Sequence, residues 1–388
     1  MSQSVKDHPA KSQPAKSQPA KFSTTDHQMM ARALRLAERG AFTTRPNPMV
    51  GCVIAQGDEV VGEGWHQRKG EAHAEVFALE AARDRAKGAT AYVTLEPCAH
   101  TGSTGPCAEA LIAAGVARVV CAMRDPFPEV DGAGIDMLQA AGIVAEVGLM
   151  DSQARELNRG FLSRIVRGRP WLRVKLAASL DGRSAMASGD SKWISSEASR
   201  HDVHRWRARS GALLTGAGTV LVDDPHLTVR LPNDEACAPP LRVVLDPGLA
   251  TVARGHVREG DAPTLYLHAP DAKPPRVLNI GHGIEHAAVP VQRGLFDLHA
   301  VLRLLADRGI NEVQLEAGAT LAGAFLSAGL VDELLLYIAP VLLGERARPL
   351  FDGLHIDEMT ERLQLKVIDT RHIGNDLRVL LRPATDAS

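Results

Sequence analysis

Cysteines, aromatic side chains and net charge are all scarce in this sequence. Its 388 residues include 5 cysteines, an odd and widely spaced set, so a disulfide framework is not expected. Phenylalanine, tryptophan and tyrosine together make up 4% of the chain, and the formal net charge is −2. A nucleic-acid or membrane-surface partner would require basic and aromatic surface, so neither kind of partner is expected.

Long hydrophobic runs are absent as well. No apolar stretch approaches the roughly 20 residues of a membrane-spanning helix, and the N-terminus lacks the apolar core of a secretory signal. These absences predict a cytoplasmic protein. Residues 1–24 are low in complexity, with a Lys-Ser-Gln-Pro-Ala repeat between Ala10 and Lys21, and have almost nothing to bury, so a disordered tail is expected there.

Helix and strand patterns alternate from residue 25 to about residue 150, which indicates an α/β layer built on one sheet. The first helix is expected to be capped by Asp26 and ended by Gly40. The other expected helices cover residues 74–87, 108–114 and 137–141, and the expected strands cover residues 49–54, 59–65, 91–95, 118–123 and 143–147.

A helix-like segment over residues 151–167 leads into a second alternating region. We place the domain boundary in this segment, so that one domain covers residues 25–150 and the other covers residues 151–388. The second domain is expected to have strands at 171–176, 212–215, 242–245, 312–315 and 333–338, and helices at 299–307 and 321–328. Residues 251–291 are rich in proline, glycine and histidine and show only a weak pattern.

One histidine and two cysteines have the residue types and surroundings of a zinc site. His73 opens a predicted helix, Cys98 follows a strand, and Cys107 opens the next helix. A catalytic zinc site uses three protein ligands and a water molecule, so we expect His73, Cys98 and Cys107 to hold Zn²⁺. Glu75 is then placed to take a proton from the water and deliver it to a leaving nitrogen. This is the H-x-E…P-C…C pattern of zinc deaminases.

The spacing of the two cysteines leaves an alternative open. Eight residues separate Cys98 from Cys107, whereas the deaminase pattern has the close C-x-x-C spacing. A structural site with His100 as fourth ligand, in a non-catalytic zinc-stabilised regulatory protein, would also fit the ligands. Glu75 favours catalysis, because a structural site has no use for a carboxylate beside its ligand.

Three segments of the second half can carry chemistry, at residues 175–183, 214–230 and 315–324. Gly318 lies between a predicted strand and a predicted helix, where backbone N–H groups can cradle a phosphate. Gly216 and Gly218 lack the third glycine of a dinucleotide fingerprint, because position 221 is leucine. A classical Rossmann domain is therefore not expected, and a tight turn is the alternative reading of each glycine.

Four short runs in the first half and the three segments of the second half resemble one family. The runs Thr43–Cys52, His73–Val76, Thr94–Cys98 and Gly105–Cys107 look like the bifunctional riboflavin-biosynthesis deaminase–reductases, which have the same long gap between the cysteines. The three second-half segments resemble the reductase half of that family in the same order. The resemblance implies a cytidine-deaminase-like three-layer αβα domain followed by a dihydrofolate-reductase-like α/β domain.

The same resemblance implies two reactions. The first is zinc-dependent hydrolytic deamination of 2,5-diamino-6-(5-phosphoribosylamino)pyrimidin-4(3H)-one. The second is NADPH-dependent reduction of the ribosyl group to ribityl, giving 5-amino-6-(5-phosphoribitylamino)uracil. A phosphorylated pyrimidine would be the small-molecule partner, and a homo-oligomer is expected because the family is typically oligomeric. The alternative is a nucleoside or base deaminase fused to an unrelated reductase.

Ligand-contacting residues also follow from the resemblance. The expected NADPH contacts are Ala177, Trp193, Thr219, Asp223, Gly318, Ala319, Thr320, Leu321, Ala322, Gly323 and Ala324. The expected substrate contacts are Ser191, Arg207, Leu227, Arg230 and Glu316.

Each of several positions has a structural alternative. Trp193 would be a core residue, and Arg207 would lie on a solvated helix face. Lys175 can assist proton transfer or simply belong to a strand. Asn47 can bind a pyrimidine edge or only form a turn. Arg230 is expected at the end of a strand over residues 227–229.

Overall fold

Helix α1 (Thr24–Glu38) opens the part of the chain that the structure, a computed structural model, describes: residues 22–99, 105–127, 132–232, 235–273 and 283–384. Most of the expected tail lies outside the described residues, but Thr24 already belongs to the helix. Ser23, rather than Asp26, is the N-cap. The Ser23 hydroxyl accepts from the Asp26 N–H at 3.1 Å, and the Asp26 carboxylate accepts from the Ser23 N–H at 2.8 Å. This reciprocal capping box explains the error, because both side chains satisfy helix-terminal donors.

The first domain has a five-stranded sheet in the order β2-β1-β3-β4-β5. Its strands are β1 (Gly51–Gln56), β2 (Glu59–Trp65), β3 (Thr90–Val93), β4 (Arg118–Cys121) and β5 (Val144–Val147). β1 runs antiparallel to β2 and β3, while β3, β4 and β5 run parallel.

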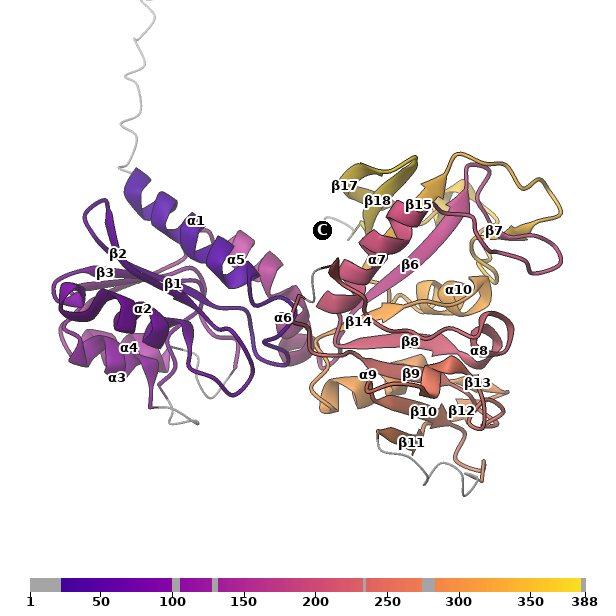
Figure 1. Cartoon of the computed structure of the whole chain (residues 1–388), viewed down its shortest axis with the longest axis horizontal. Helices are drawn as coiled ribbons and strands as arrows, with labels where there is room; N and C mark the ends of the chain where they lie inside the picture. The colour runs from indigo at the N-terminus through magenta and orange to yellow at the C-terminus, as the bar shows by residue number, and fades with distance from the viewer. Residues whose placement is uncertain (1–21, 100–104, 128–131, 233–234, 274–282, 385–388) are drawn as a thin grey trace, which may run out of the picture.

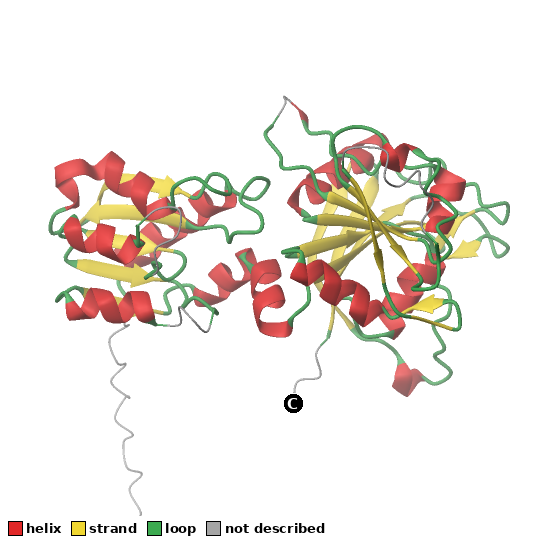
Figure 2. Cartoon of the chain, turned by 90° about the horizontal axis from the view of Figure 1, so that it is seen from below, coloured by secondary structure: helices red, strands yellow, loops and turns green. Residues whose placement is uncertain are grey.

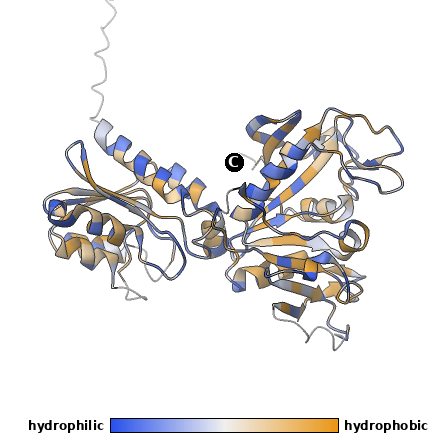
Figure 3. Ribbon diagram, in the orientation of Figure 1, coloured by the Kyte–Doolittle hydropathy of each residue, from blue (hydrophilic) through white to orange (hydrophobic). Residues whose placement is uncertain are grey.

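Helices cover both faces of this sheet, which gives the expected three αβα layers (Figure 2). On one face α1 and α5 (Asp151–Leu157) pack in a single apolar cluster. On the other face lie α2 (Ala74–Ala82), α3 (Cys107–Ala113) and α4 (Ala133–Ala140). Figure 3 shows α1 with hydrophilic residues outward and hydrophobic residues toward the sheet. The helix expected over 74–87 divides, because α2 ends at Ala82 and a 3₁₀ turn follows over Arg83–Ala86.

The second domain is built on a nine-stranded sheet in the order β11-β10-β9-β8-β14-β6-β15-β18-β17. Its strands are β6 (Trp171–Ser179), β8 (Ala212–Gly216), β9 (Leu241–Leu245), β10 (Thr264–His268), β11 (Ile284–Ala288), β14 (Glu312–Leu315), β15 (Glu333–Ala339), β17 (Leu365–Ile373) and β18 (Asp376–Pro383). The strands from β11 to β15 pair in parallel, and only the β17–β18 hairpin is added antiparallel.

The main helices of the second domain are α7 (Glu197–Arg209), α8 (Ala217–Asp223), α9 (Leu298–Asp307) and α10 (Ala319–Ser327). Short two- and three-residue strands pair outside this sheet: β7 (Arg183–Ala185), β12 (Val291–Gln292), β13 (Leu295–Phe296) and β16 (Arg348–Pro349).

Parts of the second domain differ from the sequence-based expectation. The weak region 251–291 contains the fully buried strand β10, and neither the β17–β18 hairpin nor α7 was expected. The strand expected over residues 227–229 is wrong, because Leu227 has a φ of 47° and the segment is a loop. A left-handed leucine cannot continue an extended strand.

Two short helices join the domains (Figure 1). The single helix expected over 151–167 is interrupted at Asn158, between α5 and α6 (Arg159–Arg167). The Asn158 side chain accepts from the Met49 N–H at 2.8 Å and donates to the Met49 carbonyl at 2.9 Å. Ala154 and Leu157 of α5 pack in the core of the first domain. Helix α5 thus packs with the first domain although it follows residue 150. The domain division at residue 150 remains a prediction. No described helix is long and apolar enough to cross a membrane.

Candidate active sites

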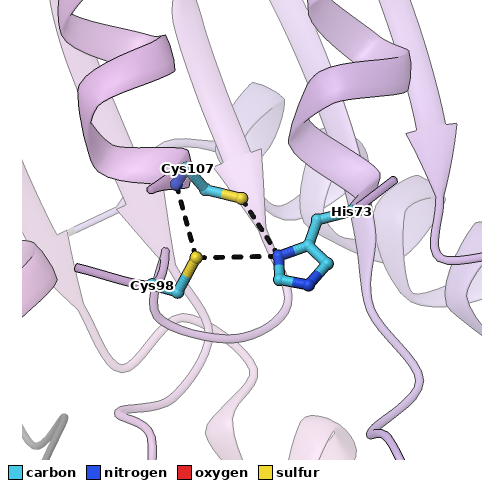
Figure 4. Close-up of side chains that lie close together, drawn as sticks. All are labelled: His73, Cys98 and Cys107. Carbon is cyan, nitrogen blue, oxygen red and sulfur yellow. Dashed lines mark hydrogen bonds between the residues drawn. The ribbon is translucent and has the colours of Figure 1, made fainter. Parts of the chain in front are cut away.

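His73, Cys98 and Cys107 converge at one end of the first sheet (Figure 4). His73 is the N-cap of α2, Cys107 is the first residue of α3, and Cys98 lies in the loop after β3. The His73 Nδ1 atom is 3.2 Å from the Cys107 sulfur and 3.6 Å from the Cys98 sulfur. Of the described residues, these three form the one group of potential metal ligands whose ligand atoms all lie within 4.8 Å of one another.

The donor set fits a catalytic zinc ion. Hydrogen bonding to the Cys107 side chain, with further help from His73, holds the pKa of the Cys98 thiol below its usual range. The Cys107 N–H also donates to the Cys98 sulfur at 3.3 Å. Two sulfurs and one imidazole leave a fourth tetrahedral position for water. His100, the alternative fourth ligand, lies outside the described residues.

Glu75 lies beside this cluster in the first turn of α2. Its side chain is buried and interacts with Cys107, and burial raises the pKa of the Glu75 carboxyl to about 7. Strand β2 brings α2 close, since a Cβ on Gly64 would lie 2.6 Å from the Ala74 carbonyl oxygen. The glycine thus allows the helix start, with His73 and Glu75, to approach the sheet.

Glu96, which the sequence analysis missed, organises the loops around Cys98. Its buried carboxylate accepts three backbone N–H bonds of 3.0–3.2 Å, from Asp125, Gly132 and Gly134. A Cβ on Gly134 would lie 1.9 Å from the Pro97 carbonyl oxygen, so the start of α4 packs directly on the Cys98 loop. The sequence did carry a signal for Glu96, because an acidic residue at the end of an apolar strand and just before Pro97-Cys98 indicates a polar role near the site.

The Asn47 side chain contacts His66, a second site residue that the sequence did not reveal. The Asn47 Nδ2 atom lies 3.1 Å from His66 Nε2, and His66 Nδ1 lies 3.1 Å from the Ala72 carbonyl. Burial lowers the pKa of His66, so the neutral ring can donate to Ala72 and accept from Asn47. The His66 ring meets the His73 ring edge-on, with centroids 5.6 Å apart. Asn47 is therefore held close to the metal ligands.

A buried ion pair marks the second site. Two nitrogens of Arg207, on α7, donate to the two carboxylate oxygens of Glu316, just after β14, at 2.6 and 2.7 Å. The Arg207 side chain is only 14% exposed, so its alternative as a solvated helix residue is wrong. Burial alone would raise the pKa of Glu316, but Arg207 outweighs it and lowers this pKa to about 2. Arg207 also donates to the Thr228 carbonyl at 3.0 Å.

Two further basic residues approach this pair. Burial lowers the pKa of the half-buried Lys175 on β6, and Glu316 partly opposes the shift. Burial, followed by Arg207 and Arg230, lowers the pKa of His204 to about 4. The neutral His204 ring accepts from the Arg230 N–H at 3.2 Å. The result is a compact cluster of charged and polar groups around Glu316.

The other expected substrate contacts differ in exposure. Arg230 is exposed, and its guanidinium donates to the Thr228 hydroxyl at 3.1 Å. Leu227 is buried in an apolar cluster, so its side chain faces the core. Ser191 is half-buried.

Most expected NADPH contacts lie toward the carboxyl ends of three neighbouring parallel strands. Ala177 is on β6, Thr219 and Asp223 are on α8 after β8, and Gly318 is the N-cap of α10 after β14. Ligands of open α/β sheets bind at this end of the strands. Trp193 is 69% exposed and stacks on Arg200 at 4.4 Å, so its alternative as a core residue is wrong.

The start of α10 is only partly available to a ligand. Gly318 and Thr320 are exposed, Ala319 and Leu321 are half-buried, and Ala324 is exposed further along the helix. Ala322 and Gly323 are buried, and a Cβ on Gly323 would lie 1.9 Å from the Asp352 carbonyl oxygen. Gly323 is thus required for packing against the Asp352 backbone.

Comparisons with known families divide the chain in the same way. The family described as the cytidine and deoxycytidylate deaminase zinc-binding region matches residues 23–123, and the RibD C-terminal domain matches residues 170–379. The riboflavin biosynthesis protein RibD of Escherichia coli is 48% identical over 362 residues, covering 91% of this chain and 98% of that protein.

Solved structures show the same likeness. RibD of Acinetobacter baumannii has a TM-score of 0.86 and 43% identity, with 93% of this chain and 99% of that chain covered. A diaminohydroxyphosphoribosylaminopyrimidine deaminase/5-amino-6-(5-phosphoribosylamino)uracil reductase from Thermotoga maritima has a TM-score of 0.81 and 32% identity, with the same coverage. The likeness therefore extends over both domains and their connection.

Proposed function

The chain belongs to the bifunctional deaminase–reductases of riboflavin biosynthesis, and from this premise we propose the role of each site residue. It is a zinc-dependent pyrimidine deaminase and an NADPH-dependent reductase. The observation that carries the deaminase assignment is the cluster of His73, Cys98 and Cys107 with Glu75 buried beside it. The matched RibD C-terminal domain excludes an unrelated reductase, and the catalytic family excludes a purely regulatory protein.

In the first reaction, a C–N bond of the pyrimidine is exchanged for a carbonyl and ammonia leaves. His73, Cys98 and Cys107 would hold zinc, which lowers the pKa of a water molecule to about 7. The Glu75 carboxylate would take a proton from the attacking water and deliver it to the departing amino group. Its raised pKa supports the role, because a carboxyl group that titrates near neutrality can accept and release a proton.

Asn47 is the residue to which we assign recognition of the pyrimidine edge. An amide both donates and accepts hydrogen bonds, as a ring with carbonyl and amino groups requires. The contact with His66 fixes the orientation of the Asn47 side chain. His66 in turn is held by Ala72, one residue before the ligand His73.

In the second reaction, NADPH supplies the hydride that converts the ribosyl group to ribityl. We assign cofactor contacts to Ala177, Trp193, Thr219, Asp223, Gly318, Ala319, Thr320, Leu321 and Ala324, while the buried Ala322 and Gly323 lie within α10 and pack this helix against the rest of the domain. Substrate contacts are assigned to Ser191, Arg207, Arg230 and Glu316, and to the backbone of Leu227. The lowered pKa of Lys175 supports a role in delivering a proton to the sugar oxygen.

We further propose that the substrate is phosphorylated, that the protein forms a homo-oligomer and that it is cytoplasmic. Arg207 and Arg230 lie close enough to affect the same histidine, His204. Glu316 and the Thr228 carbonyl already hold Arg207, so the exposed Arg230 guanidinium is the group of the two that is available to phosphate oxygens.

The proposal can be tested with the purified full chain and the diaminopyrimidine nucleotide. Ammonia should be released without NADPH, and NADPH oxidation should begin only after deamination. The deaminated nucleotide alone should be reduced even after zinc is removed with a chelator. Absence of ammonia release from zinc-loaded protein would exclude the deaminase assignment.

A further inference from the structure

The loop that carries Asn47 is held by the other domain. This loop, residues 42–49, connects α1 to β1 in the deaminase domain. The Arg45 guanidinium donates to the Ala238 carbonyl at 2.6 Å and to the Ala208 carbonyl at the end of α7. The Asn311 side chain, just before β14, donates to the Pro46 carbonyl at 2.8 Å. Each of these contacts joins the deaminase loop to the reductase domain.

Backbone groups reinforce this attachment at both ends of the loop. The Ala238 N–H donates to the Phe42 carbonyl at 2.9 Å. At the other end, the Asn158 amide bonds to both backbone groups of Met49. The loop is therefore tied down by residues that follow the deaminase core in the sequence.

A short series of contacts leads from Arg45 to the zinc ligands. The Asn47 N–H donates to the Thr44 carbonyl at 3.0 Å, so Arg45 lies within the turn that presents Asn47. Asn47 contacts His66, and His66 packs edge-on against His73. Movement of the Arg45 turn would shift Asn47 while leaving Glu75 and the cysteines in place, because these residues belong to α2, α3 and the Cys98 loop.

We propose that Arg45 is a positioning residue of the deaminase site, through which the reductase domain fixes the loop that presents Asn47 to the pyrimidine. The reductase domain is thus a structural part of the deaminase's binding site. This inference rests on the proposed role of Asn47 in substrate recognition. It predicts that deaminase substrate affinity depends on residues far outside residues 25–150.

The test measures deamination by the full-length zinc-loaded chain carrying Arg45→Ala. KM for the diaminopyrimidine nucleotide should rise about tenfold, the scale of losing one hydrogen bond from a charged donor. The value of kcat should stay within about threefold, and zinc content should not change, because the ligands and Glu75 are untouched. Arg45→Lys should recover part of the KM, since an ammonium group can still donate to one of the two carbonyls.

Asn311→Ala removes a contact to the same loop from the opposite domain, and it should raise the deaminase KM in the same direction. It carries the test if Arg45→Ala does not fold. Arg85→Ala is the control, because this exposed arginine lies in the 3₁₀ turn after α2, pairs with Glu59 and, within the described part of the chain, makes no hydrogen bond or ion pair with the Asn47 loop. Its kinetic constants should equal those of the wild type.

Three outcomes would overturn the positioning role. The first is an unchanged deaminase KM in both Arg45→Ala and Asn311→Ala. The second is an equal rise of KM in Arg45→Ala and Arg45→Lys. The third is a fall of both kcat and bound zinc in Arg45→Ala while KM stays constant. A wild-type chain that binds zinc but does not deaminate would overturn the proposed function itself. The two failures are therefore distinguished within one set of assays.

Discussion

The two active sites are assembled in different ways. The deaminase site takes its four principal residues from one segment, His73 to Cys107, whose helices and loops lie at one end of a small sheet. The reductase cluster joins Lys175, Arg207, Arg230 and Glu316, from one strand, one helix and two loops. Arg207 and Glu316 are separated by 109 positions in the sequence.

This difference determines how each site should respond to mutation. In the deaminase, the metal ligands and the proton carrier are separate groups, so chemistry can be removed while the metal stays. In the reductase, Arg207 and Glu316 neutralise each other in a largely buried place, so removing one leaves the other without its partner. A change in the second site should therefore affect both activity and stability.

The largest expected effect is the loss of deamination in Glu75→Gln. The amide keeps the size of the carboxyl group but cannot carry the proton, so kcat should fall by about a thousandfold or more. Zinc content, measured by atomic absorption, and reduction of the deaminated nucleotide should match the wild type. Near-native ammonia release from this variant would remove Glu75 from the mechanism.

Glu316→Gln should give the next largest effect, and it should be confined to the other site. The neutral amide cannot balance the Arg207 charge, and we expect kcat/KM of the reductase to fall about a hundredfold. The melting temperature of the reductase domain should also drop, while deamination stays within about twofold. Stopped assays of each step on separately supplied substrates provide the measurement. Equal loss in both activities would contradict two independently operating chemical centres.

The same contrast explains how far the sequence could predict the sites. His73 and Glu75 lie two positions apart at one helix start, and together with Cys98 and Cys107, each after a proline, their residue types indicated a zinc deaminase. The long gap between Cys98 and Cys107 required the family resemblance. Arg207 and Glu316 were named only through that resemblance, because nothing local shows that residues 109 positions apart form an ion pair.

The fold was predictable where the hydrophobic pattern was regular. Strands β2 and β14 were predicted with their observed bounds. The apolar Leu227 suggested a strand residue, but it fills the core from a left-handed loop conformation. Helix α7 was missed because its exposed face is strongly polar and few of its residues are buried. Arg45 gave no signal, since its partners are backbone carbonyls of a distant segment.

Acid should affect the reductase domain more than the deaminase domain. The pKa values of Glu316 and Glu333 are each about 2, although burial alone would raise them, because Arg207 and Arg173 respectively are close by. A carboxyl group with a lowered pKa in the folded state stabilises the protein above its unfolded pKa, and this contribution disappears as the pH falls toward the folded pKa. Stability should thus decline between about pH 4.5 and about pH 2.

Urea unfolding at a series of pH values, with both activities assayed after return to neutral pH, measures this decline. The deaminase domain has its own lowered carboxyl pKa at Asp26, where burial is outweighed by Arg118, which also pairs with Glu146, whereas the reductase domain has lowered glutamate pKa values at Glu312, Glu316 and Glu333. The reductase midpoint in urea should therefore fall at a higher pH. Parallel loss of both activities would indicate that the domains unfold as one unit.

The smallest expected effect concerns phosphate recognition by Arg230. This side chain is exposed, and its hydrogen bond to the Thr228 hydroxyl uses a single nitrogen, so the rest of the guanidinium fork can meet a phosphate group. Burial lowers the pKa of Arg230 and the nearby Arg207 adds to the shift, but Arg207 is itself paired with Glu316, so of the two arginines Arg230 is the positive group that faces solvent. Because the site is open to solvent, Arg230→Ala should cost about 1.5 kcal/mol, near the lower end for a charged hydrogen bond and equivalent to roughly tenfold in kcat/KM. The loss should appear with the phosphorylated reductase substrate and not with its dephosphorylated form.

Arg205→Ala is the matched control, since Arg205 lies exposed on α7 and pairs with Glu235. Steady-state reduction of both substrates by both variants decides the matter, and an Arg230→Ala enzyme that kept its preference for the phosphorylated substrate would exclude Arg230 from the phosphate site.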